Sequence, residues 1–292
     1  MSYPEDLRQL VDDHLAGIHF SHGSGPDGAD TTGLDEAMRY SLLAGGKRIR
    51  PVLCLATARA AGQPLAEFMD AAAALEMVHT YSLVHDDLPA MDDDDLRRGQ
   101  PTSHVKFGEA VAILAGDGLF AEAMGALAAS PAPPDRVVEA VALLSSATGV
   151  EGMVGGQYID VSAQALDADG LRHLHSLKTG RLIKASVEVA LALAGLSQDE
   201  REPYRRFASQ IGLLFQIVDD ILDVTGSDEE LGKPQGSDAR HGKVTYVSLY
   251  GLDQARSLAA ETHEQALAAL AGAGGHTEDL GRIADYIYSR EQ

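Results

Sequence analysis

The sequence predicts a single all-α domain. Ala and Leu are abundant, whereas aromatic residues make up only 5% of the chain and Trp is absent. Ala and Leu lose little free energy on entering a helix, so this composition favours helices. Helical patterns of about ten to twenty residues alternate with short Gly- or Pro-containing breakers. No segment shows the period-2 alternation of a half-buried strand, so one all-helical domain over residues 1–292 is the simplest organisation.

The expected elements follow one another with few interruptions. Residues 1–20 carry a helical pattern, and the Gly-, Ser- and Asp-rich residues 21–32 are typical of a flexible loop. From Leu34 onward, helices fill the chain between short breakers. The breakers are Gly45-Gly46, Gly62 to Pro64, Pro131 to Pro134, Gly195 and Gly226 to Pro234.

Two expected helices, 75–87 and 211–224, are apolar on nearly every side, which is typical of central, buried helices. Each is nevertheless interrupted by one polar stripe at helical spacing. Carboxylates on the inner side of a buried helix are unfavourable unless they are paired or metal-bound. We therefore expect the two stripes to share one polar cavity. The stripes are Glu76, His79, Ser82 and Asp86, and Gln216, Asp219, Asp220 and Asp223.

The charge balance excludes several classes of partner. There are 23 basic and 44 acidic residues, a formal net charge of −21, so nucleic acid and anionic membranes should repel the chain. The N-terminus lacks the basic and apolar regions of a signal peptide, and no uninterrupted apolar stretch approaches the ~18 residues of a membrane span. The single Cys54 excludes a disulfide framework and is expected to fill the core. These features favour a cytoplasmic protein without stable membrane association.

Asp219 and Asp223 lie four residues apart and therefore share one face of a helix, with Asp220 offset by about 100°. Mg²⁺ prefers oxygen ligands and often binds one or two carboxylates together with substrate phosphates. The alternatives are a helix cap and a solvated face, and the apolar flanks disfavour the latter. The pair is a candidate metal site.

A second acidic run occupies residues 85–95. Asp86 and Asp92 are six residues apart and cannot share a face of a straight helix. Pro89 should end the helix or make it bulge, so that Asp92 can fold back beside Asp86. Asp93 to Asp95 are expected to be exposed or paired with Arg97 and Arg98. A Ca²⁺ loop is disfavoured because its Gly and Glu are missing.

Three patches of basic residues accompany these motifs, and each is a candidate for binding an anionic substrate. Arg forks and Lys ammonium groups suit diphosphate oxygens, although a single basic residue is more often surface solvation. The patches contain Lys47, Arg48 and Arg50; Arg97 and Arg98; and Lys178-Thr179-Gly180 with Lys233 and Lys243.

Seven runs in this order resemble the trans-isoprenyl diphosphate synthases, most closely the bacterial farnesyl diphosphate synthases. They span residues 45 to 249, about seventy per cent of the chain. The resemblance implies a single all-α domain around a deep central cavity, usually homodimeric, with Mg²⁺ as cofactor, in three ions once substrate is bound. The runs are GGKRIRP (45–51), HDDLPAMDDDDLRRGQPTSH (85–104), GMVGGQYID (152–160), KTG (178–180), FQIVDDILDVTG (215–226), LGKPQGSD (231–238) and GKVTYVSL (242–249).

The resemblance also implies roles for individual residues. Isopentenyl diphosphate would be bound by Lys47, Arg50, His79 and Arg98, and the allylic diphosphate by Arg97, Lys178 and Lys233. Asp86, Asp92 and Asp219 would bind Mg²⁺ directly, with Asp87 and Asp223 supporting them. Thr179 and Gln216 would position the reacting ends.

The expected reaction joins an allylic diphosphate, dimethylallyl or geranyl, to isopentenyl diphosphate and releases diphosphate. Apolar walls would exclude water, and the released diphosphate could accept the proton, so His85 is assigned a packing role. A terpene cyclase is disfavoured because Asn, typical of its second metal motif, is absent and aromatic residues are scarce. A non-catalytic subunit is disfavoured because both aspartate motifs are present.

Product length depends on the floor of the cavity. Tyr81 and Ser82 lie five and four residues before Asp86, roughly 6–7.5 Å deeper along a helix axis. Tyr81 would block a growing chain and Ser82 would not. This predicts farnesyl diphosphate (C15) as the main product, with geranylgeranyl diphosphate (C20) as the alternative. The other possibility is that Tyr81 points into neighbouring helices.

Overall fold

The computed structural model describes residues 3–21, 23, 30–162, 167–226 and 244–290. The described chain is almost entirely helical, which confirms the predicted fold class. Its first part contains α1 (Glu5–Ala16), α2 (Thr32–Leu42), α3 (Ile49–Ala60), the 3-10 helix η1 (Leu65–Phe68), α4 (Met69–Asp86), α5 (Ser103–Phe107), α6 (Glu109–Ala128) and α7 (Pro134–Thr148). The remainder contains α8 (Met153–Val161), α9 (Ala168–His175), the π-helix η2 (Ser176–Gly180), α10 (Arg181–Ala194), α11 (Gln198–Thr225), α14 (Tyr246–Tyr250), α15 (Leu252–Leu270) and α16 (Glu278–Ser289).

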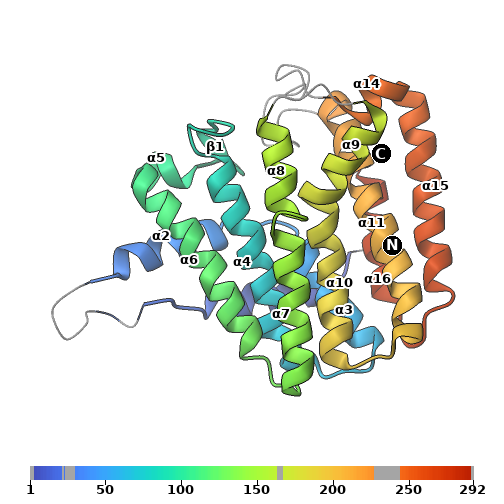
Figure 1. Cartoon of the computed structure of the whole chain (residues 1–292), viewed down its shortest axis with the longest axis horizontal. Coiled ribbons are helices and arrows are strands. Elements are labelled where there is room, and N and C mark those ends of the chain that lie inside the picture. The colour runs from blue at the N-terminus through green and yellow to red at the C-terminus, as the bar shows by residue number, and fades with distance from the viewer. Residues whose placement is uncertain (1–2, 22, 24–29, 163–166, 227–243, 291–292) are drawn as a thin grey trace.

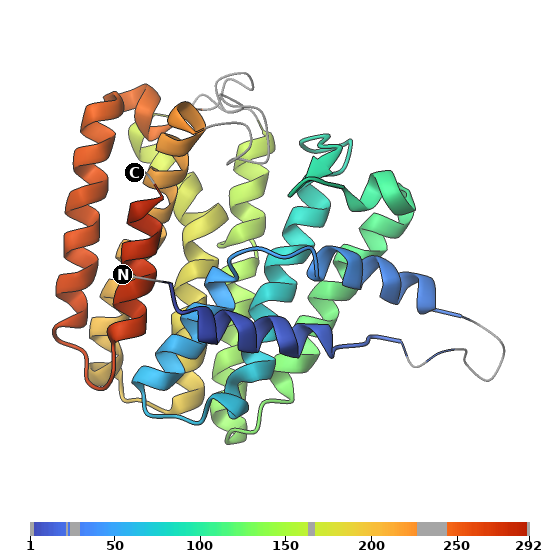
Figure 2. The same cartoon turned by 180° about the vertical axis from the view of Figure 1, so that it is seen from behind.

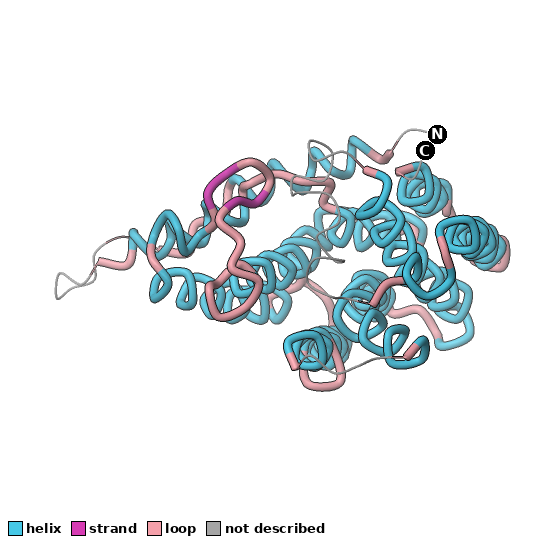
Figure 3. Tube along the Cα trace, turned by 90° about the horizontal axis from the view of Figure 1, so that it is seen from above, coloured by secondary structure: helices cyan, strands magenta, loops and turns pink. Residues whose placement is uncertain are grey.

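The long helices lie side by side in a bundle (Figure 1). In the view from behind, α1 crosses the bundle and α16 lies near the N-terminus (Figure 2). Helix α4 packs against α6, α11 against α15, and α10 against both α3 and α7. Seen from above, the described residues form helices apart from one small hairpin and the connecting loops (Figure 3).

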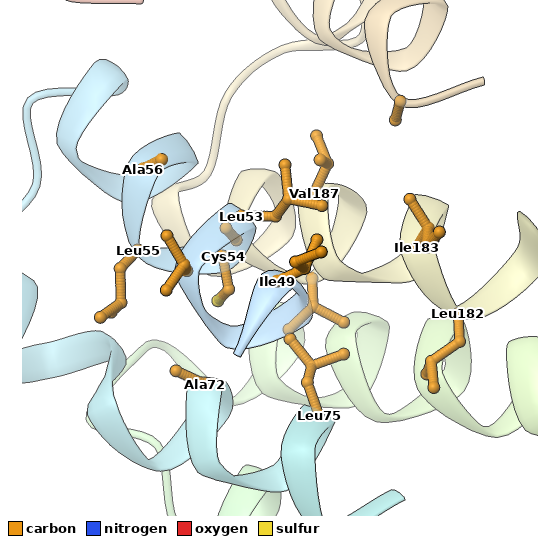
Figure 4. Close-up of a cluster of buried hydrophobic side chains, with 14 of the residues drawn as sticks. Ile49, Leu53, Cys54, Leu55, Ala56, Ala72, Leu75, Leu182, Ile183 and Val187 are labelled. Atoms are coloured by element: carbon orange, nitrogen blue, oxygen red, sulfur yellow. The ribbon is translucent and has the colours of Figure 1, made fainter. Parts of the chain in front are cut away.

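The core lies where α3, α4 and α10 meet (Figure 4). Leu53, Leu75 and Val187 are fully buried there. Cys54 is also fully buried, and burial raises the pKa of its thiol to about 12. The prediction that Cys54 fills the core is confirmed.

Two local features extend or depart from the expected elements. Helix α11 begins with a capping box between Ser197 and Glu200, so the central helix starts well before the apolar run. A short antiparallel hairpin of β1 (Leu96–Arg97) and β2 (Gln100–Pro101) was not expected. Of the predicted loop 21–32, Thr32 belongs to α2, and residues 22 and 24–29 lie outside the described part.

The expectation about membrane spans concerned uninterrupted apolar stretches, and α6 is interrupted by Asp117 and Glu122. Two helical segments, Glu109–Ala128 and Pro134–Val161, are long and apolar enough to cross a membrane by length and composition. Helix α6 packs against α4, with Ala115 and Leu119 fully buried. Its outer side exposes Ile113 by 43% and Leu114 by 55%. This helix therefore has two apolar sides, of which only one is covered within the chain.

Candidate active site

The acidic run at the end of α4 folds back as predicted. The helix ends at Asp86, and the backbone N–H of Asp92 donates to the carbonyl oxygen of Asp86 over 2.9 Å. This turn brings the two residues together although they are six apart in sequence. Burial raises the pKa of Asp86 to about 6, the Asp92 carboxylate raises it further, and the Lys178 ammonium opposes the shift.

Asp87 points to a different partner. Its carboxylate accepts hydrogen bonds from Arg97, at 2.8 and 2.9 Å from Nε and 2.5 Å from Nη2. The Asp87 side chain is 4% exposed, and burial raises its pKa against the opposing effect of Arg97. Asp94 lies 3.8 Å from the same guanidinium, as expected for the exposed part of the run. Arg97, expected at the allylic diphosphate, thus holds Asp87 at the turn that carries the acidic run.

The basic residues around the start of α3 form a positive cluster next to His79. Burial, together with Arg50, Arg98 and Arg97, lowers the pKa of His79 well below its ordinary value, so the imidazole is neutral at pH 7. Burial also lowers the pKa of Arg50 to about 10, which leaves it charged. The Nε of Arg50 is buried and has no hydrogen-bond partner among the described residues. An anion with several oxygens would satisfy this cluster.

Lys47 and Arg98 lie at the edge of this cluster. The exposed Lys47 places Nζ 5.2 Å from the ring centroid of Tyr286 in α16. Arg98 donates to the carbonyl of Gly45, and its guanidinium lies directly over Gly46. A Cβ at Gly46 would come within 2.8 Å of that guanidinium, and φ is +120° there, so this position requires glycine.

Arg48 does not belong to this cluster, which corrects its grouping as a candidate ligand. It is 4% exposed and donates to Glu76 over 2.6 Å and to Asp12 over 2.9 Å. Its left-handed φ of 53° turns the side chain inward, whereas its neighbours Lys47 and Arg50 stay at the cluster. Glu76 is therefore also a structural ion-pair partner.

The π-helix η2 presents the next predicted residues. Lys178 donates from Nζ to Asp160 of α8 over 2.6 Å, and Thr179 is half-buried beside it. Helix α8 can approach this turn only because residue 156 is glycine, since a Cβ there would lie 2.3 Å from the backbone nitrogen of Lys178. Asp160, which the sequence analysis quoted without a role, thus orients Lys178.

Helix α11 contributes the second aspartate motif. Asp219 accepts from Arg290 over 3.1 Å, and the Asp223 side chain is buried. Gln216 donates from Nε2 to Asp220 over 2.8 Å, and the other Asp220 oxygen accepts from the backbone of Tyr246 over 2.7 Å. Asp220 therefore anchors α14, while Asp219 faces the basic side, where it raises the pKa of Arg50.

The remaining residues singled out in the sequence are Tyr81, Ser82, His85, Lys233 and Lys243. Ser82 donates to the carbonyl of His79 over 2.8 Å within its own helix. The ring of Tyr81 packs edge-on against Phe120 of α6 at 5.3 Å and against His85 at 5.8 Å. His85 itself lies 3.0 Å from the carbonyl oxygen of Ile113, in keeping with a packing role. Lys233 lies outside the described residues, as does Lys243.

The donor set fits a hard divalent cation. Asp86 and Asp92 are brought together by the turn after α4, and burial without a full counter-charge raises the pKa of Asp86. No group of three or more acidic, His or Cys side chains in the described part of the chain forms a preformed metal cluster. Mg²⁺ commonly takes one or two carboxylates and completes its shell with water and substrate phosphates, so this arrangement suits Mg²⁺.

An all-α bundle with two aspartate motifs, a basic cluster and a lysine-bearing turn is the arrangement of a prenyl diphosphate synthase. The chain matches the polyprenyl synthetase family over residues 31–284 and belongs to that family. Its members among the relatives below are trans-isoprenyl diphosphate synthases.

Relatives and solved structures agree with this assignment. The chain is 49% identical over 268 residues to the heterodimeric geranylgeranyl pyrophosphate synthase large subunit 1 of Arabidopsis thaliana, covering 88% of this chain and 72% of the relative. It is also 49% identical to the geranylgeranyl pyrophosphate synthase of Capsicum annuum, with the same coverages. A crystal structure of an FPP/GFPP synthase from Zymomonas mobilis aligns with a TM-score of 0.82 and 36% identity, covering 97% of this chain and 95% of that one. A geranyltransferase structure from Legionella pneumophila has the same TM-score and 33% identity, covering 99% and 95%.

Proposed function

We propose that this prenyltransferase condenses an allylic diphosphate with isopentenyl diphosphate and elongates the chain to geranylgeranyl diphosphate. The observation that supports this reaction is that acidic and basic side chains of the predicted site lie close to one another. Asp86, at the end of α4, lies within electrostatic range of Asp92 and of Lys178 of η2, and Asp219 of α11 acts on Arg50. An anionic substrate bridged by divalent cations satisfies both groups.

Different residues of the chain would bind the two substrates. Arg50, charged and with an unpartnered Nε, and the neutral imidazole N–H of His79 would bind the diphosphate of isopentenyl diphosphate. Lys178, oriented by Asp160, and Arg97, oriented by Asp87, would bind the allylic diphosphate. Asp86, Asp92 and Asp219 would hold Mg²⁺, which when bound would neutralise the charge that develops on the departing diphosphate.

The carbon chemistry then needs no side-chain base. The allylic C–O bond breaks and its electrons leave with the diphosphate, and the double bond of isopentenyl diphosphate forms the new C–C bond. The proton lost from the adjacent carbon can pass to the released diphosphate. The residues of the site bind, orient and exclude water, and preorganised charges of this kind supply the largest share of many rate enhancements.

The C20 product is favoured over the predicted C15 product by the relatives, several of which are named geranylgeranyl pyrophosphate synthases at 45 to 49% identity. The packing of Tyr81 on Phe120 also supports it, because the ring contacts α6 and its own helix. Farnesyl diphosphate remains the second candidate, since Tyr81 stands one turn below Asp86. The solved structures at 33 to 36% identity include enzymes named for farnesyl products.

A primer experiment tests both parts of this proposal. The purified protein is incubated with Mg²⁺, isopentenyl diphosphate and, separately, dimethylallyl, geranyl or farnesyl diphosphate, and the products are sized by chromatography. A C20 synthase consumes all three primers, whereas a C15 synthase leaves farnesyl diphosphate unused. No product from any primer would refute the proposed activity.

We further propose that two copies of the chain associate through the outer side of α6. Ile113 and Leu114 expose 43% and 55% of their surface there, and Val138 of the adjacent α7 exposes 69%. Apolar side chains gathered on one side of a protein often mark an interface. Leu114→Asp should convert the dimer to a monomer in analytical ultracentrifugation, and Leu10→Asp on α1, 42% exposed, is the matched control. A monomeric wild-type protein would refute this assembly.

A further inference from the structure

A cavity lies between α9, α10, α11 and α14, and it meets the predicted catalytic site at Gln216. Its volume is about 290 Å³. We call it the α10–α11 cavity and define it by Arg172, Gly180, Arg181, Lys184, Gln216 and Tyr246. A larger open groove of about 580 Å³ continues from it and shares Lys184. Of the predicted substrate-binding cations, those within the described part of the chain line neither hollow.

The lining of the α10–α11 cavity is positively charged. Its described lining contains Arg172, Arg181 and Lys184 and no carboxylate, in a chain whose net charge is −21. Arg172 is already paired with Asp169 and donates to the Tyr250 hydroxyl over 3.1 Å. Arg181 and Lys184 have no carboxylate partner among the described residues. Two basic side chains that line the same cavity without a carboxylate partner form a candidate anion-binding site.

A buried hydroxyl points to the same conclusion independently of the charges. Tyr246 lines the cavity and is 1% exposed, and its hydroxyl oxygen has no hydrogen-bond partner in the described part of the chain. A buried hydroxyl that makes no hydrogen bond destabilises the fold. A ligand oxygen in the cavity would remove that destabilising effect.

We propose that the α10–α11 cavity binds a small anion carrying a phosphate or diphosphate group. Such a group has enough oxygens to accept hydrogen bonds from a guanidinium, an ammonium and the Tyr246 hydroxyl together. Leu213 is the only large aliphatic side chain among the described lining residues, so the lining recognises the polar group and not a hydrocarbon tail.

The cavity is joined to the predicted catalytic residues. Gly180 ends the π-turn that carries Lys178 and Thr179, and Arg181 follows directly. Gln216 lines the cavity and donates to Asp220, which also fixes the backbone of Tyr246. An anion held here therefore contacts both the turn and the glutamine that would position the allylic substrate. Bound anion would slow condensation, and this consequence, unlike the binding itself, rests on the proposed function.

Calorimetric titration of the full chain in excess chelator tests the binding directly. Inorganic diphosphate should bind wild type, and the double variant Arg181→Gln/Lys184→Gln should bind it at least tenfold more weakly. Tyr246→Phe should weaken binding less, and Lys106→Gln, which removes one positive charge from the exposed side of α5, should leave it unchanged. No binding to wild type, or binding lost in Arg97→Gln and unchanged in the double variant, would overturn the proposal.

A parallel titration with isopentenyl diphosphate identifies the source of the phosphate. If the double variant binds this ester more weakly than wild type, the cavity accepts diphosphate esters. If the double variant binds only inorganic diphosphate more weakly, the ligand of the cavity is the free anion. In steady-state assays, inorganic diphosphate should inhibit wild type noncompetitively against the allylic substrate, and the double variant only competitively. Because the binding titrations need no turnover, they remain decisive even if the proposed activity fails.

Discussion

Arg290 donates from Nη2 to the Oδ1 of Asp219 over 3.1 Å, which ties the end of α16 to a predicted metal ligand of α11. The same guanidinium lies 5.3 Å from the ring of Phe215. The sequence analysis gave no role to this arginine. Arg290 would therefore compete with a bound divalent cation for one oxygen of Asp219.

Arg290→Gln should consequently strengthen apparent Mg²⁺ binding. The side chains of the pair are 28% and 40% exposed, and an ion pair of that exposure contributes no more than about 1 kcal/mol, which corresponds to roughly fivefold. Activity measured against Mg²⁺ concentration gives the half-saturation point. Arg282→Gln, in the same helix but paired with Asp279, serves as the control. An unchanged or higher Mg²⁺ requirement in Arg290→Gln would contradict the competition.

The aspartate motifs should make turnover depend on the metal. Asp86→Ala or Asp219→Ala should lower kcat/KM by roughly a thousandfold or more, since several kcal/mol of charge stabilisation are lost. Excess chelator should abolish turnover of wild type. The exposed Asp253 of α15 offers a matched control, Asp253→Ala, with no expected effect. Full activity in excess chelator would refute the assignment of the aspartate motifs as ligands of a required metal ion.

Burial of Asp86 should cost stability when no metal is present. Its folded-state pKa of about 6 lies above the ordinary value of 3.8, so the carboxyl favours folding below pH 4, and that contribution is lost as pH rises through about 6. At pH 7 in chelator, Asp86→Asn should therefore raise the free energy of unfolding by about 2 to 3 kcal/mol. The gain should shrink steadily between pH 6 and pH 4 in urea denaturation. A gain independent of pH would point to packing instead.

The two diphosphate sites should separate in steady-state kinetics. Arg50→Gln and His79→Gln should raise KM for isopentenyl diphosphate at least tenfold, because both side chains belong to the basic cluster at α3. Lys178→Gln should raise KM mainly for the allylic substrate, since Lys178 lies on the η2 side. Equal changes in both KM values for all three variants would discredit this division.

The parts of the site that depend on local periodicity were predictable from sequence. Pro89 and the spacing of Asp86 and Asp92 predicted the reversal that the backbone hydrogen bond confirms. Arg48 was wrongly grouped with the candidate ligands because the sequence does not distinguish it from the adjacent basic residues. Only the structure shows that the left-handed backbone at Arg48 directs its side chain into the core. Asp160 and Arg290 were missed because their partners lie far along the chain, 18 and 71 residues away, beyond the reach of helical spacing. The run GMVGGQYID did hold a usable signal, an aspartate one turn after a glycine pair.

Tyr81 provides the test of product length. The residue is 9% exposed, its ring packs against Phe120 and His85, and it lies one turn below the predicted metal ligand Asp86. If the ring forms part of the floor, a growing chain stops when its end meets it, so removing the ring deepens the pocket. Tyr81→Ala should then lengthen the product by at least one isoprene unit relative to the wild-type product, as measured by chromatography of the dephosphorylated products. Tyr81→Phe keeps the ring and should leave the product distribution unchanged. If Tyr81→Ala is active and makes the wild-type product, the ring only packs α4 against α6, and the floor is formed by other residues.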